Sequence, residues 1–398
     1  MLHLHNDWTK NGEHISSLSA RAPSVAIVFP VFSHYRLQLF LRLRKLLEDA
    51  GIRLVLVYGK GSEINVTKQV EVSWLPPSRS REFEALGKNL VWQELPPEAY
   101  TANLAILIQE NRYLSNHVLL WRRHNANLPT AFWGHGLNHQ AHPNSIGNRI
   151  KRSYLKKVDW WFAYTEGVAR LVEKMGYPSE RITVVQNAID TEELIATRQR
   201  VTAEEVAQLR KSLRLDPGPV GIYCGRLYHE KRISFLLSAA TQIRAQIPNF
   251  QVIVIGSGAD APLVQDFAKN HPWLHYVGES YDADRAKYFA LADVFLMPGL
   301  VGLAILDAFA FGTPIFTTNY PYHSPEIEYL VHGENGVMSP DNLEDYVSAV
   351  VSVVRQPKKL AFMKRNCSAA AKLYTIQQMA INMASGIKAA LAIKRYRT

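Results

Sequence analysis

Two cations follow one short apolar run in the second half of the chain. Residues 221–224 (Gly-Ile-Tyr-Cys) are predicted to form a strand, Gly225 and Arg226 come directly after it, and Lys231 stands five residues beyond Arg226. A guanidinium offers a planar fork of donors, and an ammonium offers a point charge. Side chains of these two types, leaving one strand–helix turn, can together bind a diphosphate. Two separate surface cations are the alternative interpretation.

Two further turns that contain glycine lie at the ends of predicted strands. Gly256 and Gly258 follow one strand, and Gly302 precedes a helix that is expected to begin at Leu303. Glycine allows backbone N–H groups to approach an anion at the start of a helix. Asp307 lies about one turn inside that helix among apolar residues, where a carboxylate can accept hydrogen bonds from sugar hydroxyls. Simple tight turns and an exposed helix charge are the alternatives.

In the first half of the chain, a histidine stands between two glycines. A short apolar strand is expected to end in Gly134-His135-Gly136. An imidazole at such a place is accessible to a ligand and can form a hydrogen bond with a hydroxyl, although a single histidine is more often structural. His139 and His142 are less well placed. A metal site built from these histidines is the alternative, but no carboxylate stands at ligand spacing from them.

The composition is typical of a folded chain with no membrane-spanning helix. Its 398 residues suit two domains, and a hydrophobic fraction of 47% with 20% charged residues excludes a disordered chain. No run approaches the roughly 18 apolar residues of a spanning helix. Cys224 and Cys367 are too few for a disulfide framework or a thiolate metal site, and they fit a reducing compartment as buried thiols. The first residues lack a secretion signal, so we expect a cytoplasmic protein.

Most of the net charge of +10 lies in the first half of the chain. Two clusters carry it, namely Arg36, Arg42, Arg44 and Lys45, and then Arg149, Lys151, Arg152, Lys156 and Lys157. Such clusters suit an anionic membrane surface or an anionic substrate, and a solvated helix face is the alternative. No zinc-finger spacing or RNA-binding signature is present, so no nucleic-acid partner is expected. Aromatic residues beside the clusters suit either a membrane surface or the core: Phe40, Tyr154, Trp160 and Trp161.

Strand-like and helix-like segments alternate along both halves, which is typical of parallel βαβ units. In the first half we expect strands at 24–32, 53–58, 117–120, 130–133, 160–164 and 182–185, and helices at 35–50 and around 105–109. In the second half we expect strands at 221–224, 251–255, 274–277, 294–297 and 315–318, and helices at 233–247, 261–269, 284–291 and 303–311. A hinge is expected near 195–218, where Asp-Pro-Gly-Pro ends a polar stretch. The predicted fold class is α/β, with two doubly wound Rossmann-like domains facing a cleft.

A series of segments, taken in order, resembles one known family. The segments are Asn187-Ala188-Ile189-Asp190, Gly225-Arg226-Leu227, Lys231, Gly256-Ser257-Gly258, the stretch 306–314, Pro325-Glu326-Ile327 and Asn335-Gly336. They resemble the retaining family-4 glycosyltransferases with the GT-B fold, and ordered agreement is more specific than any single motif. The first half is similar in its strand–helix layout and its Gly134-His135-Gly136 turn. The resemblance implies an acceptor-binding domain at 1–200, with a C-terminal helix at 374–398 that returns to it, and a donor-binding domain at 201–373.

The resemblance also implies roles for the donor site. Arg226 and Lys231 would hold the diphosphate of a nucleotide-sugar and stabilise the charge of the leaving nucleotide. Asp307 would bind the ribose hydroxyls. The other residues implied at the donor are Gly225, Gly256, Gly258, Val277, Gly278, Gly302 and Leu303, with Val277 and Gly278 lining the base pocket and the last two touching phosphate and sugar through their amides.

The sugar-transfer side of the site is implied in less detail. His135 would lie near the transferred sugar as a catalytic group, and Asn187 would contact that sugar too. Two positions depart from the family pattern. Gly299 stands where the family has the first glutamate of its Glu-x7-Glu motif, and Asp307 is a shortened form of the second. Ser33-His34-Tyr35-Arg36 replaces the glycine pair that the family has after its opening strand. A side chain there, His34 or Arg36, would narrow the cleft or add a charge near the phosphates.

The expected activity follows from this resemblance. It implies a retaining, metal-independent, hexosyltransferase-type enzyme of bacterial polysaccharide assembly, which moves a sugar from a UDP- or GDP-linked donor to a saccharide or lipid-linked saccharide. No cofactor and no metal are expected. Association with an anionic membrane surface on the cytoplasmic side is a secondary hypothesis, which rests on the basic clusters and not on the resemblance. Gly299 leaves a catalytically impaired nucleotide-sugar-binding partner as one alternative. A GT-B-like sugar-nucleotide epimerase is the other.

Overall fold

The chain divides into two compact units. The computed structural model describes residues 22–59, 78–85, 88–137 and 153–393. Of these, residues up to Gln186 together with those from Gln377 onward form unit 1, and Asn187–Ile376 form unit 2. The first crossing therefore lies at 186/187 rather than near 200, so the helix that follows Asp190 groups with unit 2. The second crossing, at 376/377, places the C-terminal helical segment with unit 1.

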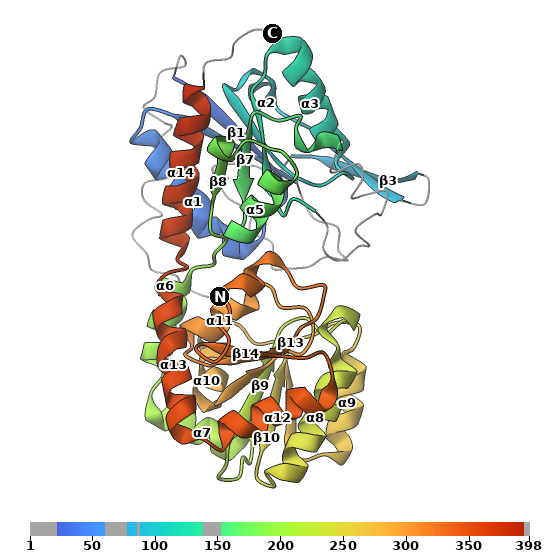
Figure 1. Cartoon of the computed structure of the whole chain (residues 1–398), viewed down its shortest axis with the longest axis vertical. Helices are drawn as coiled ribbons and strands as arrows, with labels where there is room; N and C mark the ends of the chain where they lie inside the picture. The colour runs from blue at the N-terminus through green and yellow to red at the C-terminus, as the bar shows by residue number, and fades with distance from the viewer. Residues whose placement is uncertain (1–21, 60–77, 86–87, 138–152, 394–398) are drawn as a thin grey trace. The chain divides into compact units, whose positions relative to one another are not determined.

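Unit 1 is built on a parallel sheet with strand order β2-β1-β5-β6-β7-β8. Its strands are β1 (Ser24–Val31), β2 (Arg53–Gly59), β5 (Leu104–Ile108), β6 (Thr130–Gly134), β7 (Trp160–Ala163) and β8 (Ile182–Val184). Its helices include α1 (Leu37–Glu48), α2 (Pro97–Thr101), α3 (Leu114–Ala126), α5 (Glu166–Lys174) and α14 (Ile376–Ala392). An antiparallel hairpin, β3 (Ser80–Ala85) with β4 (Lys88–Gln93), projects beside α3 (Figure 1).

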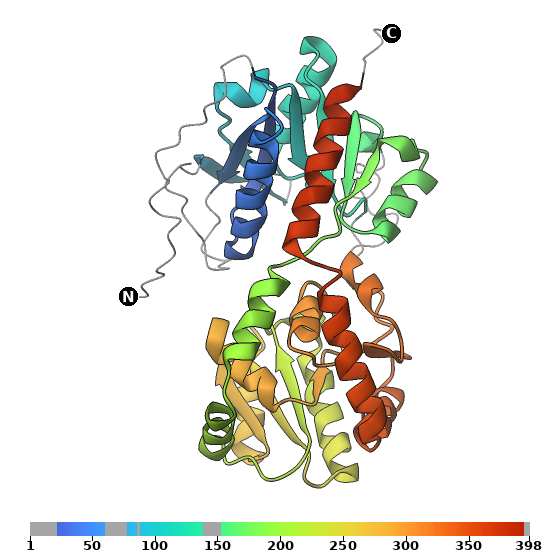
Figure 2. The same cartoon turned by 90° about the vertical axis from the view of Figure 1, so that its left-hand side faces the viewer.

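The C-terminal helix α14 lies along the sheet of unit 1, near α1 (Figure 2). A glycine makes the close approach possible, because a Cβ at Gly386 would lie 2.4 Å from Thr183 Oγ1 in β8 and 2.7 Å from the Phe162 ring in β7. Arg42 in α1 donates a hydrogen bond to Gln377, with Nη1 3.1 Å from Oε1. The last helix is thus an integral part of the first unit.

Two sequence-based predictions in unit 1 are wrong. Residues 105–109 were expected in a helix, but they belong to β5, and 117–120 were expected to form a strand, but they belong to α3. All five residues of β5 (Leu-Ala-Ile-Leu-Ile) are buried between β1 and β6. A strand buried on both faces shows no alternation, so periodicity does not separate it from a buried helix. The run at 117–120 is likewise too short to be assigned by its apolar character.

Unit 2 is a second parallel sheet, with strand order β11-β10-β9-β12-β13-β14. Its strands are β9 (Val220–Cys224), β10 (Gln251–Ile255), β11 (Leu274–Gly278), β12 (Val294–Leu296), β13 (Ile315–Thr318) and β14 (Gly336–Ser339). Its helices are α6 (Thr191–Arg200), α7 (Ala203–Ser212), α8 (Ile233–Gln246), α9 (Ala261–Asn270), α10 (Asp282–Leu291), α11 (Ala304–Ala310), α12 (Leu343–Val354) and α13 (Pro357–Ala371). The α/β class with two parallel Rossmann-like sheets is confirmed, and the elements expected in this half lie within two residues of their predicted bounds.

The aromatic residues that suited a membrane surface belong largely to the core. Phe40, Trp160 and Trp161 are 0%, 6% and 0% exposed. The first basic cluster is also largely neutralised or buried: Arg36 is buried, Arg44 pairs with Glu48, and Lys45 pairs with Asp49. In the second cluster, Lys156 and Lys157 are exposed, and Arg149, Lys151 and Arg152 lie outside the described residues. No helix among the described residues is long and apolar enough to cross a bilayer.

Candidate functional site

Three turns at the carboxyl ends of neighbouring strands in unit 2 are joined by backbone hydrogen bonds. The N–H of Gly225, after β9, donates to Ile255 O in β10 (3.0 Å), and the N–H of Gly256, after β10, donates to Gly278 O in β11 (2.7 Å). The N–H of Leu227 donates to Ser257 O (2.8 Å). The ends of parallel strands are where α/β folds bind ligands. These hydrogen bonds make the three predicted turns one continuous surface.

Close backbone packing explains two of the glycines in these turns. A Cβ at Gly256 would lie 1.9 Å from Gly225 O, and one at Gly258 would lie 2.2 Å from Leu227 O. Both residues have positive φ, at +138° and +146°, which side chains rarely allow. The β9 and β10 turns can therefore interlock only because glycine occupies both positions. The sequence identified these glycines, but it did not show that they pack against each other's turns.

The two predicted cations both lie beside one aromatic ring. The centroid of the Tyr228 ring is 5.9 Å from Arg226 Cζ and 5.8 Å from Lys231 Nζ. Arg226 is exposed, whereas Lys231 is buried at 7% exposure. Burial lowers the pKa of Lys231 to about 8, against a smaller opposing effect of Glu230. The pair thus combines a solvent-facing guanidinium with an ammonium whose charge is costly to bury.

The segment 298–302, between β12 and α11, packs directly onto the turn that carries Lys231. Lys231 Nζ donates to Leu300 O (2.6 Å), and the N–H of Leu300 donates to Glu230 O (2.8 Å). A Cβ at Gly299 would lie 2.4 Å from Glu230 O and 2.6 Å from the carbonyl carbon of Lys231. Because backbone atoms cannot rotate away, position 299 admits no side chain while the segment lies here.

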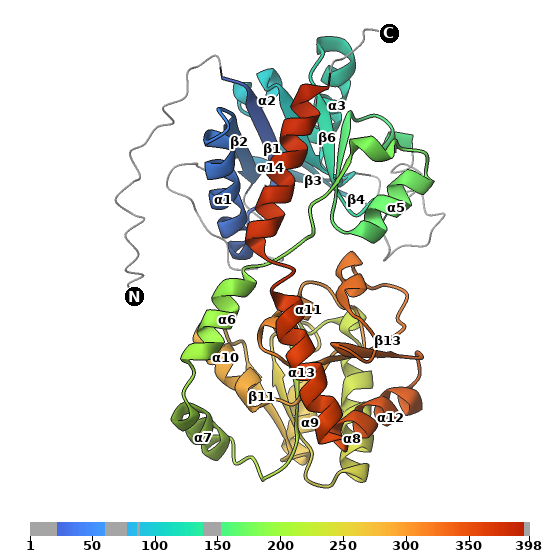
Figure 3. The same ribbon diagram turned by 60° about the vertical axis from the view of Figure 1, so that its left-hand side comes forward.

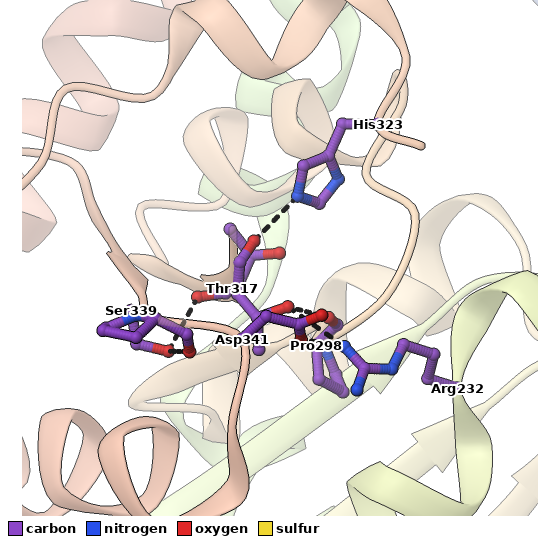
Figure 4. Close-up of polar contacts among 8 residues, drawn as sticks. Arg232, Pro298, Thr317, His323, Ser339 and Asp341 are labelled. Atoms are coloured by element: carbon purple, nitrogen blue, oxygen red, sulfur yellow. Dashed lines mark hydrogen bonds and ion pairs between the residues drawn. The ribbon is translucent and has the colours of Figure 1, made fainter. Parts of the chain in front are cut away.

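The end of β13 holds the other side of the same segment (Figure 4). Thr318 Oγ1 donates to Pro298 O (2.9 Å) and accepts from Arg232 Nη1 (3.2 Å), and Arg232 also forms an ion pair with Asp341. The His323 ring accepts from the Val301 N–H at Nδ1 (3.0 Å) and donates from Nε2 to Thr318 O (2.8 Å). Burial and the nearby charge of Lys231 hold the pKa of His323 below its ordinary value. His323 is thus a neutral imidazole with both ring nitrogens bonded.

Asp307, predicted to bind a ribose, is held by an arginine from the neighbouring helix. Its Oδ1 lies 2.9 Å from Arg285 Nη2 in α10, and the two side chains are 14% and 22% exposed. Figures 1 and 3 show α10 beside α6 in unit 2. The first turn of the short helix α11 therefore presents a carboxylate that is already paired with a cation. Its contact with a ribose stays a prediction.

The predicted base-pocket turn is present at the edge strand β11. Gly278 has φ +70°, and no other atom lies within 4 Å of the position that its Cβ would occupy. Val277 is half-buried beside it. Glu279 accepts hydrogen bonds from Ser257 and from Tyr281, and these lower the pKa of the Glu279 carboxyl, with a smaller contribution from Arg226. The charge of Arg226 thus acts on a carboxylate that directly follows β11. No hydrogen bond to the N–H groups of Gly302 and Leu303 is found among the described residues.

Asn187 lies in unit 2 and is buried at 1% exposure. Its side-chain amide donates a hydrogen bond to Glu326, and its carbonyl accepts one from the Tyr329 hydroxyl (3.0 Å). The Tyr329 ring stacks on Tyr374, at a centroid distance of 3.9 Å. The 3-10 helix at Pro325–Tyr329 therefore contacts Asn187 and Tyr374, which lie inside unit 2 close to the two crossings of the chain. A contact of Asn187 with a sugar stays a prediction, because its amide is engaged here.

The predicted residues of unit 1 occupy different environments. His135 is half-buried at the end of β6, and its ring lies 4.3 Å from that of Tyr164. His34 is exposed. Arg36 is 2% exposed, with its guanidinium 5.4 Å from the Trp133 ring centroid and 3.6 Å from Met379 Sδ in α14. Arg36 is therefore packed within unit 1, and the idea that it adds charge to an open cleft is not supported by its burial.

Histidines 139 and 142 lie outside the described residues. Within the parts of the chain that the structure covers, no group of three or more His, Cys, Asp or Glu side chains is close enough to hold a metal ion. Both cysteines are buried, and burial raises the pKa of Cys224 to about 11.

Two family models match successive parts of the chain. The model described as Glycosyltransferase Family 4 matches residues 38–193, and the model described as Glycosyl transferases group 1 matches residues 218–356. Together they span most of both units. The chain belongs to the family-4 glycosyltransferases. Their GT-B fold, inferred above from motifs, agrees with the two parallel Rossmann-like sheets.

Curated relatives of this glycosyltransferase are distant. The alpha-monoglucosyldiacylglycerol synthase of Acholeplasma laidlawii is 24% identical over 236 residues, which are 58% of this chain and 58% of the relative. The UDP-N-acetylglucosamine–peptide N-acetylglucosaminyltransferase GtfA subunit of Streptococcus pneumoniae is 21% identical over 282 residues, which are 67% of this chain and 48% of the relative. The glycosyltransferase thus matches only about half of the length of these relatives.

The similarity in fold to a solved structure covers nearly the whole of both chains. The Anabaena protein HepE, crystallised in complex with UDP-glucose, superposes with a TM-score of 0.65 at 14% identity, covering 91% of this chain and 99% of that one. At this identity the likeness establishes the fold alone.

Sequence reasoning missed the contacts of three residues of this glycosyltransferase. His323 follows β13 by five residues, the kind of position that singled out His135, but no glycines frame it. Arg285 lies inside a helix with no motif around it, and only its pairing with Asp307 reveals it. Glu326 belongs to a segment that resembled the family, yet its partner Asn187 lies 139 positions away.

Proposed function

We propose that this chain transfers a hexose from a UDP- or GDP-linked donor to a saccharide or lipid-linked saccharide acceptor. The observation that carries the proposal is the joined surface at the ends of β9, β10 and β11, with Arg226 and Lys231 beside it. A guanidinium and an ammonium at strand ends suit a diphosphate. The names of relatives support the class: one is named as a synthase of alpha-monoglucosyldiacylglycerol, and another is named for UDP-N-acetylglucosamine.

The proposed mechanism begins with the negative charge that develops on the leaving nucleotide. Arg226 and Lys231 bind the diphosphate and stabilise the charge that develops on it as the bond to the sugar breaks, a role that is often the largest electrostatic contribution to catalysis. Because these cations neutralise the diphosphate, the proposal includes no metal ion and no cofactor. The proposal also includes retention of the anomeric configuration, which the resemblance to the family implies. Asp307 binds the ribose, and Val277 and Gly278 line the base.

Two sets of residues are proposed for the sugar from the family pattern, each considered within its own unit: His135 in unit 1, and the amides of Gly302 and Leu303 in unit 2. His135 acts as a hydrogen-bonding group to the sugar, since an imidazole at the end of a strand reaches ligand hydroxyls. Asn187 contacts the sugar only if its amide leaves Glu326. We propose a cytoplasmic location. We propose that contact with an anionic membrane uses exposed lysines such as Lys156 and Lys157 rather than the paired cluster of α1. Vesicle flotation with and without anionic lipid measures this contact.

The test combines binding and turnover. A thermal-shift screen against UDP, GDP and their common sugar conjugates should raise the melting temperature with one nucleotide, because a ligand bound only by the folded state stabilises it. The double variant Arg226→Ala/Lys231→Ala should then lose about 10²–10³-fold or more in turnover. Lys269→Ala, which removes an exposed cation paired with Asp266, is the control. Turnover that survives in the double variant would remove the assignment. For the unaltered protein, we expect a rate that EDTA does not change, because the proposal includes no metal ion.

A second candidate function rests on Gly299. The chain has Gly299 where the family has its first motif carboxylate, and the packing of segment 298–302 leaves no space for a side chain there. A nucleotide-sugar-binding partner without catalysis would show the same surface. This candidate predicts calorimetric binding of the nucleotide with no turnover for any acceptor. Incubation of the donor alone, with a search for an isomerised sugar nucleotide, distinguishes an epimerase.

A further inference from the structure

Lys231 and His323 hold the two ends of one peptide group. Lys231 Nζ donates to the carbonyl oxygen of Leu300 (2.6 Å), and the N–H of Val301 donates to His323 Nδ1 (3.0 Å). The C=O of Leu300 and the N–H of Val301 belong to the same amide. A hydrogen bond at one end of an amide polarises it and strengthens the bond at the other end. The two side chains, 92 positions apart in the sequence, are therefore linked through the peptide between residues 300 and 301.

The peptide can lie between these side chains only because of its neighbour. A Cβ at Gly299 would meet the backbone of Glu230 and Lys231 at 2.4–2.7 Å. The opposite side is closed by the N–H of Ser324, which donates to Val301 O (2.9 Å), and by the His323–Thr318 bond. The peptide is thus bonded at both of its polar atoms and at the carbonyl that follows it.

The function of this arrangement concerns the ammonium of Lys231. A lysine has three donors and a flexible stem, and the Leu300 carbonyl fixes the direction of one of them. We propose that His323 is a positioning residue of the donor site, which acts through the Leu300–Val301 peptide to hold the Lys231 ammonium in place for the donor diphosphate. The proposal rests on the proposed function, since it assumes that Lys231 meets the diphosphate.

Protonation of His323 should break this link. The imidazole accepts the Val301 N–H only while Nδ1 carries no proton, and an imidazolium would meet an N–H group instead of offering it an acceptor. The charged and titratable groups that face His323 are Lys231 from the turn before α8, Asp341 after β14 and the ring of Tyr320 at 5.9 Å. Lys231 opposes protonation and Asp341 favours it, while Asp341 is itself paired with Arg232.

Substitution of His323 by asparagine or by glutamine tests the two ring nitrogens one at a time. His323→Asn places an oxygen near the position of Nδ1 and keeps an acceptor for Val301, and His323→Gln reaches the position of Nε2 and keeps only a donor for Thr318. Calorimetry with UDP and with GDP, between pH 5.5 and 8.5, measures the effect. We expect His323→Asn to bind within about threefold of the unaltered protein and His323→Gln to bind about tenfold more weakly, the equivalent of one lost hydrogen bond.

The pH profile distinguishes positioning from a merely structural contact. In the unaltered protein the affinity should fall toward acidic pH, and in His323→Asn this decline should shrink to the part that comes from the titration of the nucleotide's own phosphate. If His323→Gln does not fold, the profiles of the unaltered protein and His323→Asn still decide. Equal affinities for the two variants, or equal acidic declines with and without the imidazole, would overturn the proposal. Absence of UDP and GDP binding in the unaltered protein would instead remove the proposed function, and this inference with it.

Discussion

The Arg285 guanidinium in α10 lies 2.9 Å from a carboxylate oxygen of Asp307 in α11, and both side chains are largely buried. Arg285 also interacts with the Cys224 thiol at the end of β9. One cation thus joins the strand that leads to Arg226 with the carboxylate predicted to bind the ribose. The orientation of Asp307 in unit 2 depends on a residue outside every recognised motif.

Arg285→Ala removes the cation from this largely buried carboxylate. Because a buried charge depends strongly on its partner, we expect the free energy of unfolding to fall by about 1–3 kcal/mol. Urea unfolding, monitored by hydrogen exchange in unit 2, measures this loss of stability. Lys269→Ala breaks a pair whose members are 72% and 74% exposed, and should cost less than about 0.5 kcal/mol. Equal losses in the two variants would show that the Arg285–Asp307 pair has no special weight.

The lowered pKa of Lys231, about 8, predicts two opposite pH trends. Between pH 8 and the usual lysine range near 10.5, the unfolded chain binds more protons than the folded one, so stability rises with pH. The full effect for this group is about 3 kcal/mol, present as a penalty below pH 8 and relieved above it. Over the same range the affinity for UDP should fall, because the ammonium that meets the diphosphate loses its charge.

Lys231→Met isolates both trends. From pH 8 to 10.5, the free energy of unfolding of the unaltered protein should rise relative to that of the variant, which has no titrating group at this position. The variant should bind UDP weakly at every pH. An affinity that stays constant across this range in the unaltered protein would contradict a charged role for Lys231.

Gly299→Ala tests the close packing of segment 298–302. The added methyl would meet backbone atoms at 2.4–2.7 Å, so the segment must shift or the fold must lose about 1–3 kcal/mol. We expect a lower melting temperature together with weaker UDP binding, and Gly299→Glu should not restore a donor contact. Gly302→Ala is the matched control for stability, since its methyl comes no closer than 3.4 Å to Ser324 Oγ. A Gly299→Ala protein as stable as the control would contradict the packing.

Asn187→Asp places a second carboxylate against Glu326. Asn187 is buried, and its amide donates to that carboxylate, so the substitution should cost more than about 2 kcal/mol at neutral pH and less in acid, where one carboxyl can take up a proton. Asn342→Asp is the matched control. Asn342 is an exposed N-cap whose amide also donates to a carboxylate, that of Asp345, and aspartate caps a helix equally well. Similar thermal unfolding of the two variants would disprove a special role for the Asn187–Glu326 bond.

The sequence predicted unit 2 better than unit 1. In unit 2, strands alternate with amphipathic helices at regular spacing, and glycines mark where the strands end. In unit 1, the buried strand β5 has no alternation, and the apolar run at 117–120 lies within α3, so local pattern assigned both incorrectly. The chain crossing lies at 186/187, before the polar stretch that suggested a hinge, because α6 packs on α10 and α11 of unit 2.

The sequence by itself determined the fold class, the family resemblance and the types of residue at the strand ends, because periodicity, glycine and charge are local properties. Only the tertiary structure decided how those residues are used. The bond from Lys231 to the Leu300 carbonyl joins residues 69 positions apart, and that from Asn187 to Glu326 joins residues 139 positions apart. Which atoms meet across such separations depends on the packing of parallel strands side by side, and no spacing in the sequence encodes it.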